Sequence, residues 1–346
     1  MRELRFIGPG LADWHDVADP VLAGPAAAMV RPIAVGTCDL DALIIRGEVS
    51  LPGGFPLGHE FVAEVVSVGE SVLTVNAGDL VSVPFQINCG ECVRCRRGMS
   101  GRCSAVPPGS SYGLGTLGGA HWGGALSDLV VVPYADAMCI PLPHTADASA
   151  LAGLSDNLPD GWRTVAPHVG PGGAFAADRR VLILGKGSIG LYAAAVARAL
   201  GAEVLYVDPD ERNCMIAAGF GAAVRHEVPH RKYPSHPVVV HTTATVEGLR
   251  VALRATASSG VCTDVGIFFE KNVPLPLFDM YAKGITFITG RTDARSAMPQ
   301  VLSLVNETAL PLSAIITQTA SWDDAPEAWR EQQGRLVLVR PAGAGV

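Results

Sequence analysis

The chain has 346 residues, of which 49% are hydrophobic and 17% charged, and its formal net charge is −7. This composition excludes a disordered chain, and the acidic balance argues against a protein that binds nucleic-acid phosphates. The length favours two domains. No run approaches the roughly 18 apolar residues of a membrane span, and the start does not resemble a signal peptide, so we expect a cytoplasmic protein.

The first half of the chain predicts short strands separated by many turns. Glycine (39 residues) and proline (25 residues) are frequent, and they bound β-rich runs at 61–68, 80–84 and 129–133. Such runs between Gly and Pro are typical of strands. We therefore predict a β-rich, barrel-like domain over residues 1–149, completed by residues 285–346.

From about residue 150 the pattern changes to strands that alternate with helices. Continuous apolar runs indicate strands buried on both faces, and their alternation with helices predicts a doubly wound parallel sheet. We assign residues 150–284 to this second domain. The predicted strands are 181–184, 204–208, 238–243 and 261–267, and the predicted helices are 189–200 and a segment near 246–257.

Half of the eight cysteines lie close together in the pattern C-x2-C-x2-C-x7-C, formed by Cys89, Cys92, Cys95 and Cys103. Two-residue gaps let neighbouring thiolates reach one tetrahedral ion, and the lobe has little apolar surface around which to fold. Disulfides or free thiols are the alternatives, and disulfides fit poorly with a cytoplasmic location. The pattern predicts a structural zinc, whose four thiolate ligands leave no position for a substrate.

Gly185, Gly187 and Gly190 form a G-x-G-x-x-G between a predicted strand and a predicted helix, the context of a dinucleotide-binding turn. The alternative is a structural turn without a ligand. Asp208 ends the next strand, where a carboxylate accepts hydrogen bonds from the ribose hydroxyls and repels a 2′-phosphate. This favours NAD over NADP, although Arg212 lies near. The expected cofactor contacts are Gly185, Gly187, Ser188, Ile189, Gly190, Asp208, Arg212, Thr242, Val265 and Gly266.

A second set of metal-ligand types is scattered along the chain, at Cys38, His59 and Asp156. No local spacing links these residues. Each also has a simple structural interpretation, as a buried thiol, a turn histidine or a helix cap. The residues by themselves leave metal binding and structural roles equally open.

Two motifs give the chain a family resemblance. Gly58-His59-Glu60, followed by Gly69 and Val72, resembles the zinc signature of zinc-containing alcohol dehydrogenases of the medium-chain dehydrogenase/reductase superfamily. It departs from that signature at Ala63, where glycine is usual. Cys38 with Asp41 is similar to the family's Cys-x-Ser/Thr-Asp, and the cysteine lobe and the glycine-rich turn follow in the expected order. Leu154-Ser-Asp156, followed by Leu158-Pro159, resembles the branch that contains formaldehyde, polyol and threonine dehydrogenases.

The resemblance implies an α/β protein with a GroES-like catalytic domain and a Rossmann NAD-binding domain. It further implies a catalytic zinc held by Cys38, His59 and Asp156, with an open fourth position and with Glu60 beside the ligands or as a transient ligand. With the structural zinc, that makes two ions per chain. The implied reaction is hydride transfer between an alcohol, or its aldehyde or ketone, and NAD, with the substrate oxygen on the zinc. A homodimer or homotetramer is also implied.

Three departures concern proton transfer. Leu40 and Leu43 replace the Ser/Thr and His of the usual relay, and Asp160 replaces a Thr. The implied routes for the proton are therefore Asp39, Asp160, Glu60 or water. The missing relay also motivates an alternative function, a zinc- and NAD-binding protein without turnover, such as a redox-responsive binding module. A zinc-free quinone reductase of the same superfamily is a third possibility, against which the cysteine lobe argues.

Overall fold

The computed structural model describes residues 1–118, 122–230 and 232–341. The chain forms two compact units. The first consists of Met1–Pro159, Asp293–Leu302 and Ile316–Val346, and the second consists of Asp160–Thr292 and Ser303–Ile315. The first unit is therefore assembled from segments at both ends of the sequence.

The predicted domain boundaries differ from these units in three places. Residues 150–159 belong to the first unit, and residues 303–315 belong to the second. Residues 285–292 also belong to the second unit, because β14 (Thr286–Thr289) pairs in parallel with β13 (Thr256–Asp264). β14 was not predicted, because its sequence lacks a continuous apolar run and three of its four residues are exposed.

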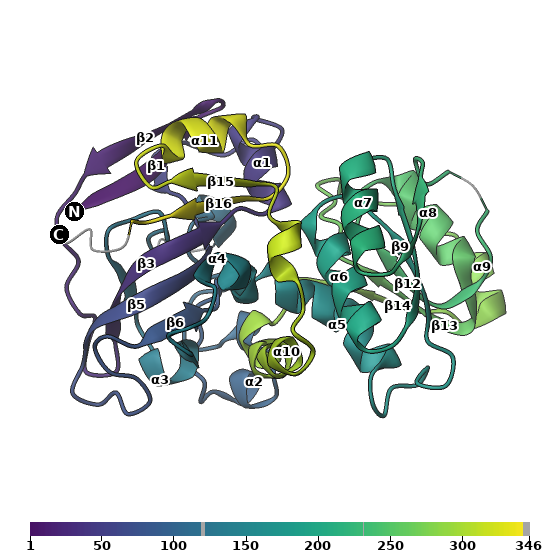
Figure 1. Ribbon diagram of the computed structural model, residues 1–346, viewed down its shortest axis with the longest axis horizontal. Helices are drawn as coiled ribbons and strands as arrows, with labels where there is room; N and C mark the ends of the chain where they lie inside the picture. Colours follow the sequence, from purple (N-terminus) through teal and green to yellow (C-terminus); the bar gives the residue numbers. More distant parts are fainter. Residues whose placement is uncertain (119–121, 231, 342–346) are drawn as a thin grey trace. The chain divides into compact units, whose positions relative to one another are not determined.

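A large sheet with the order β15-β16-β3-β5-β6-β8, with β7 beside β3, forms the centre of the first unit (Figure 1). The central strands β3 and β5 pair in the antiparallel direction. The predicted strands 61–68, 80–84 and 129–133 appear in this sheet as β5, β6 and β7. The strands are β3 (Ala28–Gly36), β5 (Glu60–Val68), β6 (Leu80–Val83), β7 (Val130–Val132), β8 (Ile140–Leu142), β15 (Gln318–Ser321) and β16 (Leu336–Val339).

A smaller sheet with the order β2-β1-β4 completes the β structure of the first unit. Phe61, Tyr112, Trp322 and Trp329 are among the largest fully buried side chains of this unit. The small sheet contains β1 (Arg2–Gly8), β2 (Leu11–Asp16) and β4 (Phe55–Pro56). The short helices are α1 (Asp39–Ile45), α2 (Val93–Arg96), α3 (Ala135–Met138), α4 (Ala148–Leu151) and α11 (Ala325–Glu331), with 3-10 turns at Ser100–Arg102, Gly115–Gly118 and Ala152–Ser155.

The second unit contains the predicted doubly wound sheet, with six parallel strands in the order β11-β10-β9-β12-β13-β14. Helices α6 and α7 cover one face and α8 and α9 the other (Figure 1). The strands are β9 (Arg180–Leu184), β10 (Glu203–Asp208), β11 (Ala223–His226), β12 (His236–His241), β13 and β14. The helices are α5 (Asn157–Val169), α6 (Ser188–Ala199), α7 (Glu211–Gly219), α8 (Val246–Ala255), α9 (Leu277–Lys283) and α10 (Ala294–Thr308), of which α5 and α10 begin in the first unit; a 3-10 turn follows at Leu312–Ile315.

The strand ends differ slightly from the prediction. Because β12 ends at His241 and β13 at Asp264, Thr242, Val265 and Gly266 lie in the turns that follow these strands. The carboxyl ends of parallel strands are where doubly wound folds bind ligands. Within the described residues, no helix combines the length and apolarity that crossing a membrane requires.

Candidate functional site

Cys38, His59 and Asp156 converge in the first unit. Cys38 follows β3 and precedes α1, His59 precedes β5, and Asp156 follows the turn Ala152–Ser155. One ligand atom from each lies within 4.8 Å of those of the other two. His59 Nε2 lies 3.5 Å from Asp156 Oδ2. Residues up to 118 positions apart in the sequence therefore present a thiol, an imidazole and a carboxylate to one point.

The β sheet explains this convergence. Gly36 of β3 lies opposite Glu60 of β5, so Cys38 and His59 leave adjacent strands at the same edge. Ser155 fixes the third residue, because its Oγ accepts a hydrogen bond from the N–H of Phe61 and donates one to the carbonyl of Phe61, each over 3.0 Å. Asp156 is thereby tied to the strand that begins beside His59.

Gly58 allows the chain to approach the core closely before His59. Its φ is +89°, in the left-handed region that favours glycine, and a Cβ there would lie 2.8 Å from the N atom of Leu126. A side chain at this position would push His59 away from the other two residues.

Asp41 lies behind Cys38 and His59, and it is fully buried. Its Oδ2 accepts a hydrogen bond from the N–H of Cys38 over 2.9 Å, and its Oδ1 faces His59 Nδ1 at 3.6 Å. Nε2 of His59 is therefore the nitrogen that points towards Asp156. A carboxylate behind a ligating imidazole is the usual support for a metal ligand. Asp41 belongs to the Cys38 motif of the sequence, but the motif alone assigns it no role.

The donor set fits a divalent cation such as zinc. Burial, reinforced by Asp41, raises the pKa of Cys38 to about 12, so the thiol stays protonated at neutral pH without a nearby cation. Sulfur, nitrogen and carboxylate oxygen are all zinc ligands, and three protein ligands leave a fourth position open, as in catalytic sites.

Glu60 forms a buried ion pair with Arg335, in which the guanidinium donates to Oε2 over 2.5 Å. The N–H of Asn157 donates to Oε1 over 2.7 Å, and Arg335 also donates to the carbonyl of Thr37. Burial raises the pKa of Glu60 to about 7, while Arg335 opposes this rise. Glu60 thus holds the residues on both sides of the cluster together. Sequence reasoning missed Arg335 because 274 residues separate the two.

The four predicted lobe cysteines also converge, with their sulfurs within 4.8 Å of one another. The Sγ atoms of Cys89 and Cys103 are 3.6 Å apart and those of Cys92 and Cys103 are 4.0 Å apart. These separations are far longer than a disulfide bond and match the roughly 3.8 Å edge of a tetrahedron of sulfurs about 2.3 Å from one zinc. All eight cysteines are free thiols.

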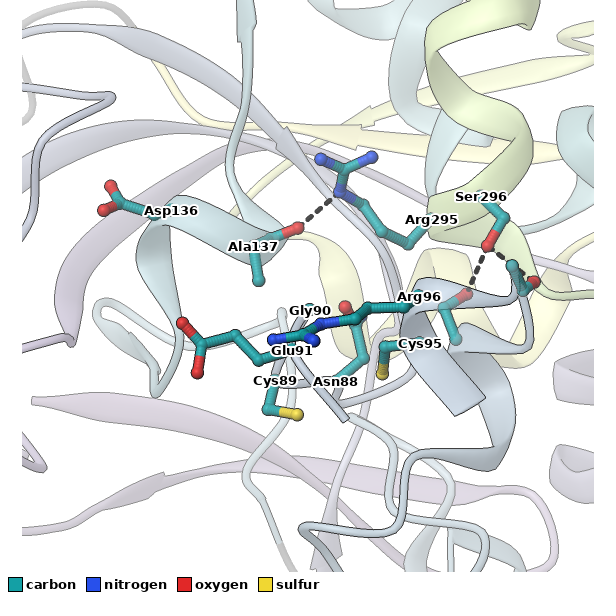
Figure 2. Close-up of a pocket in the computed structure, with 12 residues that line it drawn as sticks. Asn88, Cys89, Gly90, Glu91, Cys95, Arg96, Asp136, Ala137, Arg295 and Ser296 are labelled. Atoms are coloured by element: carbon teal, nitrogen blue, oxygen red, sulfur yellow. Dashed lines mark hydrogen bonds between the residues drawn. The ribbon is translucent and has the colours of Figure 1, made fainter. Parts of the chain in front are cut away.

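Backbone N–H groups favour the thiolate form of Cys92, whereas burial raises the pKa values of Cys95 and Cys103. The N–H of Cys95 donates to Cys92 Sγ over 3.5 Å, and that of Ala105 donates to Cys103 Sγ over 3.4 Å. Hydrogen bonds from Ser104 lower the pKa of Cys92 to about 5. A cavity of about 530 Å³ opens beside the lobe, with Cys89 and Cys95 among its walls (Figure 2).

The glycine-rich turn joins β9 to α6. Gly187 is the N-cap residue of α6 with φ +80°, and it has no side chain to cap the N–H groups of Ser188 and Ile189 that begin the helix. Thr242 braces the turn, since its Oγ1 accepts from the N–H of Lys186 over 3.0 Å and a Cβ on Gly190 would lie 3.0 Å from it. An open helix N-terminus behind a glycine turn suits a pyrophosphate.

Asp208 ends β10 as predicted, but its side chain is fully buried. Tyr206 Oη donates to Oδ2 over 2.7 Å, Asn213 Nδ2 donates to Oδ2 over 3.0 Å, and the N–H of Asp210 donates to Oδ1 over 2.8 Å. Burial raises the pKa of Asp208, and these hydrogen bonds oppose the rise. Oδ1 keeps more acceptor capacity than Oδ2. Arg212 is exposed in the first turn of α7.

The candidate proton carriers differ in their surroundings. Glu60 is held by Arg335, and Asp160 pairs with Arg163. Asp39 is the exposed first residue of α1, directly after Cys38. Leu40 and Leu43 pack against the hydrophobic core of the first unit. The two apolar replacements therefore contribute to the core, and Asp39 is exposed whereas Glu60 and Asp160 are buried.

Each of the two units contains a match to a known protein family. The family described as alcohol dehydrogenase GroES-like domain matches residues 24–144, and the family described as zinc-binding dehydrogenase matches residues 188–307. An alcohol dehydrogenase from Thermus sp. ATN1 has a similar structure, with a TM-score of 0.88 and 27% identity over 99% of this chain and all of that one.

Two curated relatives share the sequence pattern. A glutathione-independent formaldehyde dehydrogenase of Pseudomonas aeruginosa is 38% identical over 60% of this chain, and this chain spans 53% of that enzyme. A medium-chain reductase/dehydrogenase of Acremonium sp. is 31% identical over 64% of this chain and 74% of its own length.

Proposed function

The chain belongs to the zinc-containing alcohol dehydrogenases of the medium-chain dehydrogenase/reductase superfamily, and we propose that it transfers a hydride between an alcohol, or its aldehyde or ketone, and NAD. The convergence of Cys38, His59 and Asp156 is the observation that carries this proposal. Three such ligands with an open fourth position are typical of a catalytic metal, whereas a closed set of four is typical of a structural one.

Each bound group supplies one part of the chemistry. Cys38, His59 and Asp156 would hold a zinc ion that would supply Lewis-acid chemistry towards the substrate oxygen, and a bound nicotinamide would supply the hydride chemistry. Asp41 keeps the Nε2 atom of His59 directed at the cluster, and Ser155 keeps Asp156 in place. The Glu60–Arg335 pair stabilises the segments on both sides of these residues.

For the second site, we assign Cys89, Cys92, Cys95 and Cys103 to a structural zinc. Their sulfur separations and the N–H groups directed at them support this assignment. The lobe would keep this zinc away from chemistry, since all four ligand positions are filled.

We expect NAD rather than NADP at the glycine-rich turn. The expected contacts are the N–H groups at the start of α6, Thr242, and the turns at Val265 and Gly266. The buried carboxylate of Asp208 supports this preference, because a 2′-phosphate beside it would be repelled. Exposed Arg212 is the residue that could attract such a phosphate instead.

The proposal is tested by metal analysis together with turnover. We expect two zinc ions per chain, one for each cluster. We also expect formation of NADH, followed by absorbance, with at least one member of a panel of primary alcohols, polyols, hydroxy amino acids and hydrated formaldehyde. Tight NADH binding with two zinc ions and no turnover on either alcohols or carbonyls would instead support the binding module without catalysis, which the missing relay motivates.

We further propose that Asp39 passes the alcohol proton to solvent in place of the usual relay. It follows a predicted zinc ligand and is exposed. Replacement by Ala should lower kcat for alcohol oxidation while the zinc content stays the same. An unchanged kcat in the Asp39→Ala variant would leave water as the carrier.

A homo-oligomer is also proposed, and the second unit supports it. In the described chain β14 is the last strand of its sheet, and the nearby helix α9 exposes Leu277, Phe278 and Tyr281 by 67%, 81% and 86%. An open strand edge beside large exposed apolar side chains is typical of an interface. Light scattering should give a dimer or tetramer for the wild type and a smaller species for Phe278→Glu.

A further inference from the structure

A row of polar side chains crosses the carboxyl ends of β12, β13 and β14. His241, Asp264 and Thr289 are paired neighbours on the three strands. His241 Nδ1 lies 2.7 Å from Asp264 Oδ1, and Thr289 Oγ1 donates to Asp264 Oδ2 over 3.1 Å. His241 and Asp264 are 0% and 2% exposed. Such buried groups are retained only where every polar atom has a partner.

The hydrogen bonds of this row converge on Asp264 from His241 on one side and from Thr289 on the other. If His241 Nδ1–H donates to ionised Asp264, then Nε2 must accept, and the hydroxyl of Thr243 lies 2.7 Å from it. Thr245 then donates to Thr243 over 2.9 Å and itself accepts from the N–H of Gly248 over 3.1 Å. The chain of bonds therefore extends from Asp264 to the first turn of α8.

This chain encloses a backbone position that is unfavourable for its residue. Ala244 lies between Thr243 and Thr245 with φ +52°, in the left-handed region that non-glycine residues seldom adopt. Strained positions of this kind persist only where their surroundings hold them, and they gather at functional sites. The bonds of Thr243 to His241 and to Thr245 supply that hold on either side of Ala244.

The turn after β13 is fixed against the same residues. The N–H of Gly266 donates to Asp264 Oδ1 over 3.0 Å, and a Cβ on Gly266 would lie 3.0 Å from Ala244 Cα. The ring of Phe268 stacks on that of His241, with centroids 6.2 Å apart and planes 13° apart. The turns 242–245 and 265–268 thus depend on one buried pair for their shape.

The position of the row in the sheet indicates what these turns bind. His241 lies opposite Leu184, the last residue before the glycine-rich turn, and the strand order reverses between β9 and β12. A doubly wound sheet carries one mononucleotide half of a dinucleotide on each side of this reversal. The glycine-rich turn and Asp208 belong to the first half. The His241–Asp264 row belongs to the second.

We infer that His241 and Asp264 are positioning residues for the nicotinamide mononucleotide half of the dinucleotide, which they serve by fixing the turns 242–245 and 265–268. This inference rests on the proposed NAD-dependent function. The inference assigns a role in cofactor binding to His241 and Asp264, which belong neither to the two metal-ligand clusters nor to the site expected for the adenosine half of the dinucleotide.

The test compares two ligands that differ only in that half. Calorimetry with NADH and with ADP-ribose, which lacks the nicotinamide, should give binding by the wild type to both. In His241→Ala the Kd for NADH should rise about tenfold or more, equivalent to about 1.4 kcal/mol, while the Kd for ADP-ribose stays within about twofold. His241→Asn keeps an amide donor near Asp264, and it should recover part of the NADH affinity.

Matched variants guard against a general loss of folding. Thr263→Val removes a buried hydroxyl that bonds the carbonyl of Thr164, next to Asp264 but outside the row, and should leave both Kd values unchanged. Thr243→Val removes the hydroxyl that bonds to His241 Nε2. It should cause the same selective loss of NADH affinity, and it serves as the test variant if His241→Ala does not fold. Equal weakening of both ligands, or no change for NADH, in the folded variants overturns the inference. A wild type that binds neither ligand overturns the proposed function and the inference together.

Discussion

The two clusters of metal-ligand side chains are built in opposite ways. The four side chains of the cysteine lobe all come from residues 89–103, and local N–H groups point at their sulfurs. The other cluster brings together Cys38, His59 and Asp156, which a sheet edge and the hydrogen bonds of Ser155 position and which a buried ion pair supports. A local site depends on its own loop, and a dispersed site depends on the fold.

This difference suits the two proposed roles. A loop that folds around its metal contributes stability and closes its coordination shell. A cluster held by a sheet is rigid before the metal arrives, and so it can leave one position open. Mutations should therefore damage activity at the dispersed cluster and stability at the lobe.

The largest expected effect separates the two clusters by activity. Asp156→Ala removes one of three ligands, and kcat/KM should fall by about 10³-fold or more, since a catalytic metal supplies several kcal/mol. Steady-state kinetics and zinc analysis measure this. Asp147→Ala, which removes a helix cap in the same unit, is the matched control and should keep both zinc ions. Full activity in Asp156→Ala would contradict the assignment of this cluster to catalysis.

The lobe should show the reverse behaviour. Cys103→Ser should release one zinc and lower the free energy of unfolding by about 4 kcal/mol, in the range expected for loss of a structural metal. Calorimetric melting measures the loss, and kcat per zinc-loaded molecule should remain near that of the wild type at low temperature. Cys214→Ser, outside both clusters, should retain the zinc. A large fall in kcat with an unchanged melting temperature would reverse the two roles.

Asp41 tests how strongly the dispersed cluster depends on residues behind it. Asp41→Asn keeps an acceptor for the N–H of Cys38 but removes the charge that faces His59 Nδ1, so zinc affinity should fall about 10- to 100-fold. Competition with a chelator gives the affinity. Asp39→Asn on the same helix should leave zinc affinity unchanged, and an equal loss in both variants would point to the helix rather than to Asp41.

The smallest expected effect concerns Ser155. Ser155→Ala removes both hydrogen bonds to Phe61 and should cost about 1 kcal/mol of unfolding free energy, with weaker zinc binding at the dispersed cluster only. Denaturant unfolding and metal analysis measure the two effects. Ser303→Ala, an exposed serine of α10, should change neither. Loss of the lobe zinc in Ser155→Ala would show that the clusters are not independent.

Features with a local cause could be predicted from the sequence. The apolar run 181–184 followed by glycines at fixed spacing predicted β9 and its turn, and the cysteine spacing predicted the lobe. The spacing of Cys38, His59 and Asp156 carried no such information, and only the family resemblance brought these residues together. They meet because β3 pairs with β5 and because Ser155 bonds to Phe61.

Features that depend on distant partners escaped prediction. Arg335 and Glu60 have no sequence pattern in common, because they meet only when β16 pairs with β3. Asp208 could be located at the end of β10, but its burial under Tyr206 and Asn213 depends on packing. β14 has mostly exposed residues and no apolar pattern, and it forms a strand because it pairs with β13. In each case the determining interaction lies outside the window that a local pattern can cover.

The pairing of β16 with β3 also has a consequence for how the protein is made. All the residues of both clusters precede residue 160 and are therefore synthesised first. The sheet beside the dispersed cluster is complete only after β16 (Leu336–Val339) has been synthesised and has paired with β3. By then the second unit has emerged and can fold as a unit of its own. The cysteines of the lobe are complete early in translation, whereas the Glu60–Arg335 pair behind the dispersed cluster must wait for the segment that contains β16. A ribosome that stalls before residue 335 would release a product in which the dispersed cluster lacks the support of the Glu60–Arg335 pair.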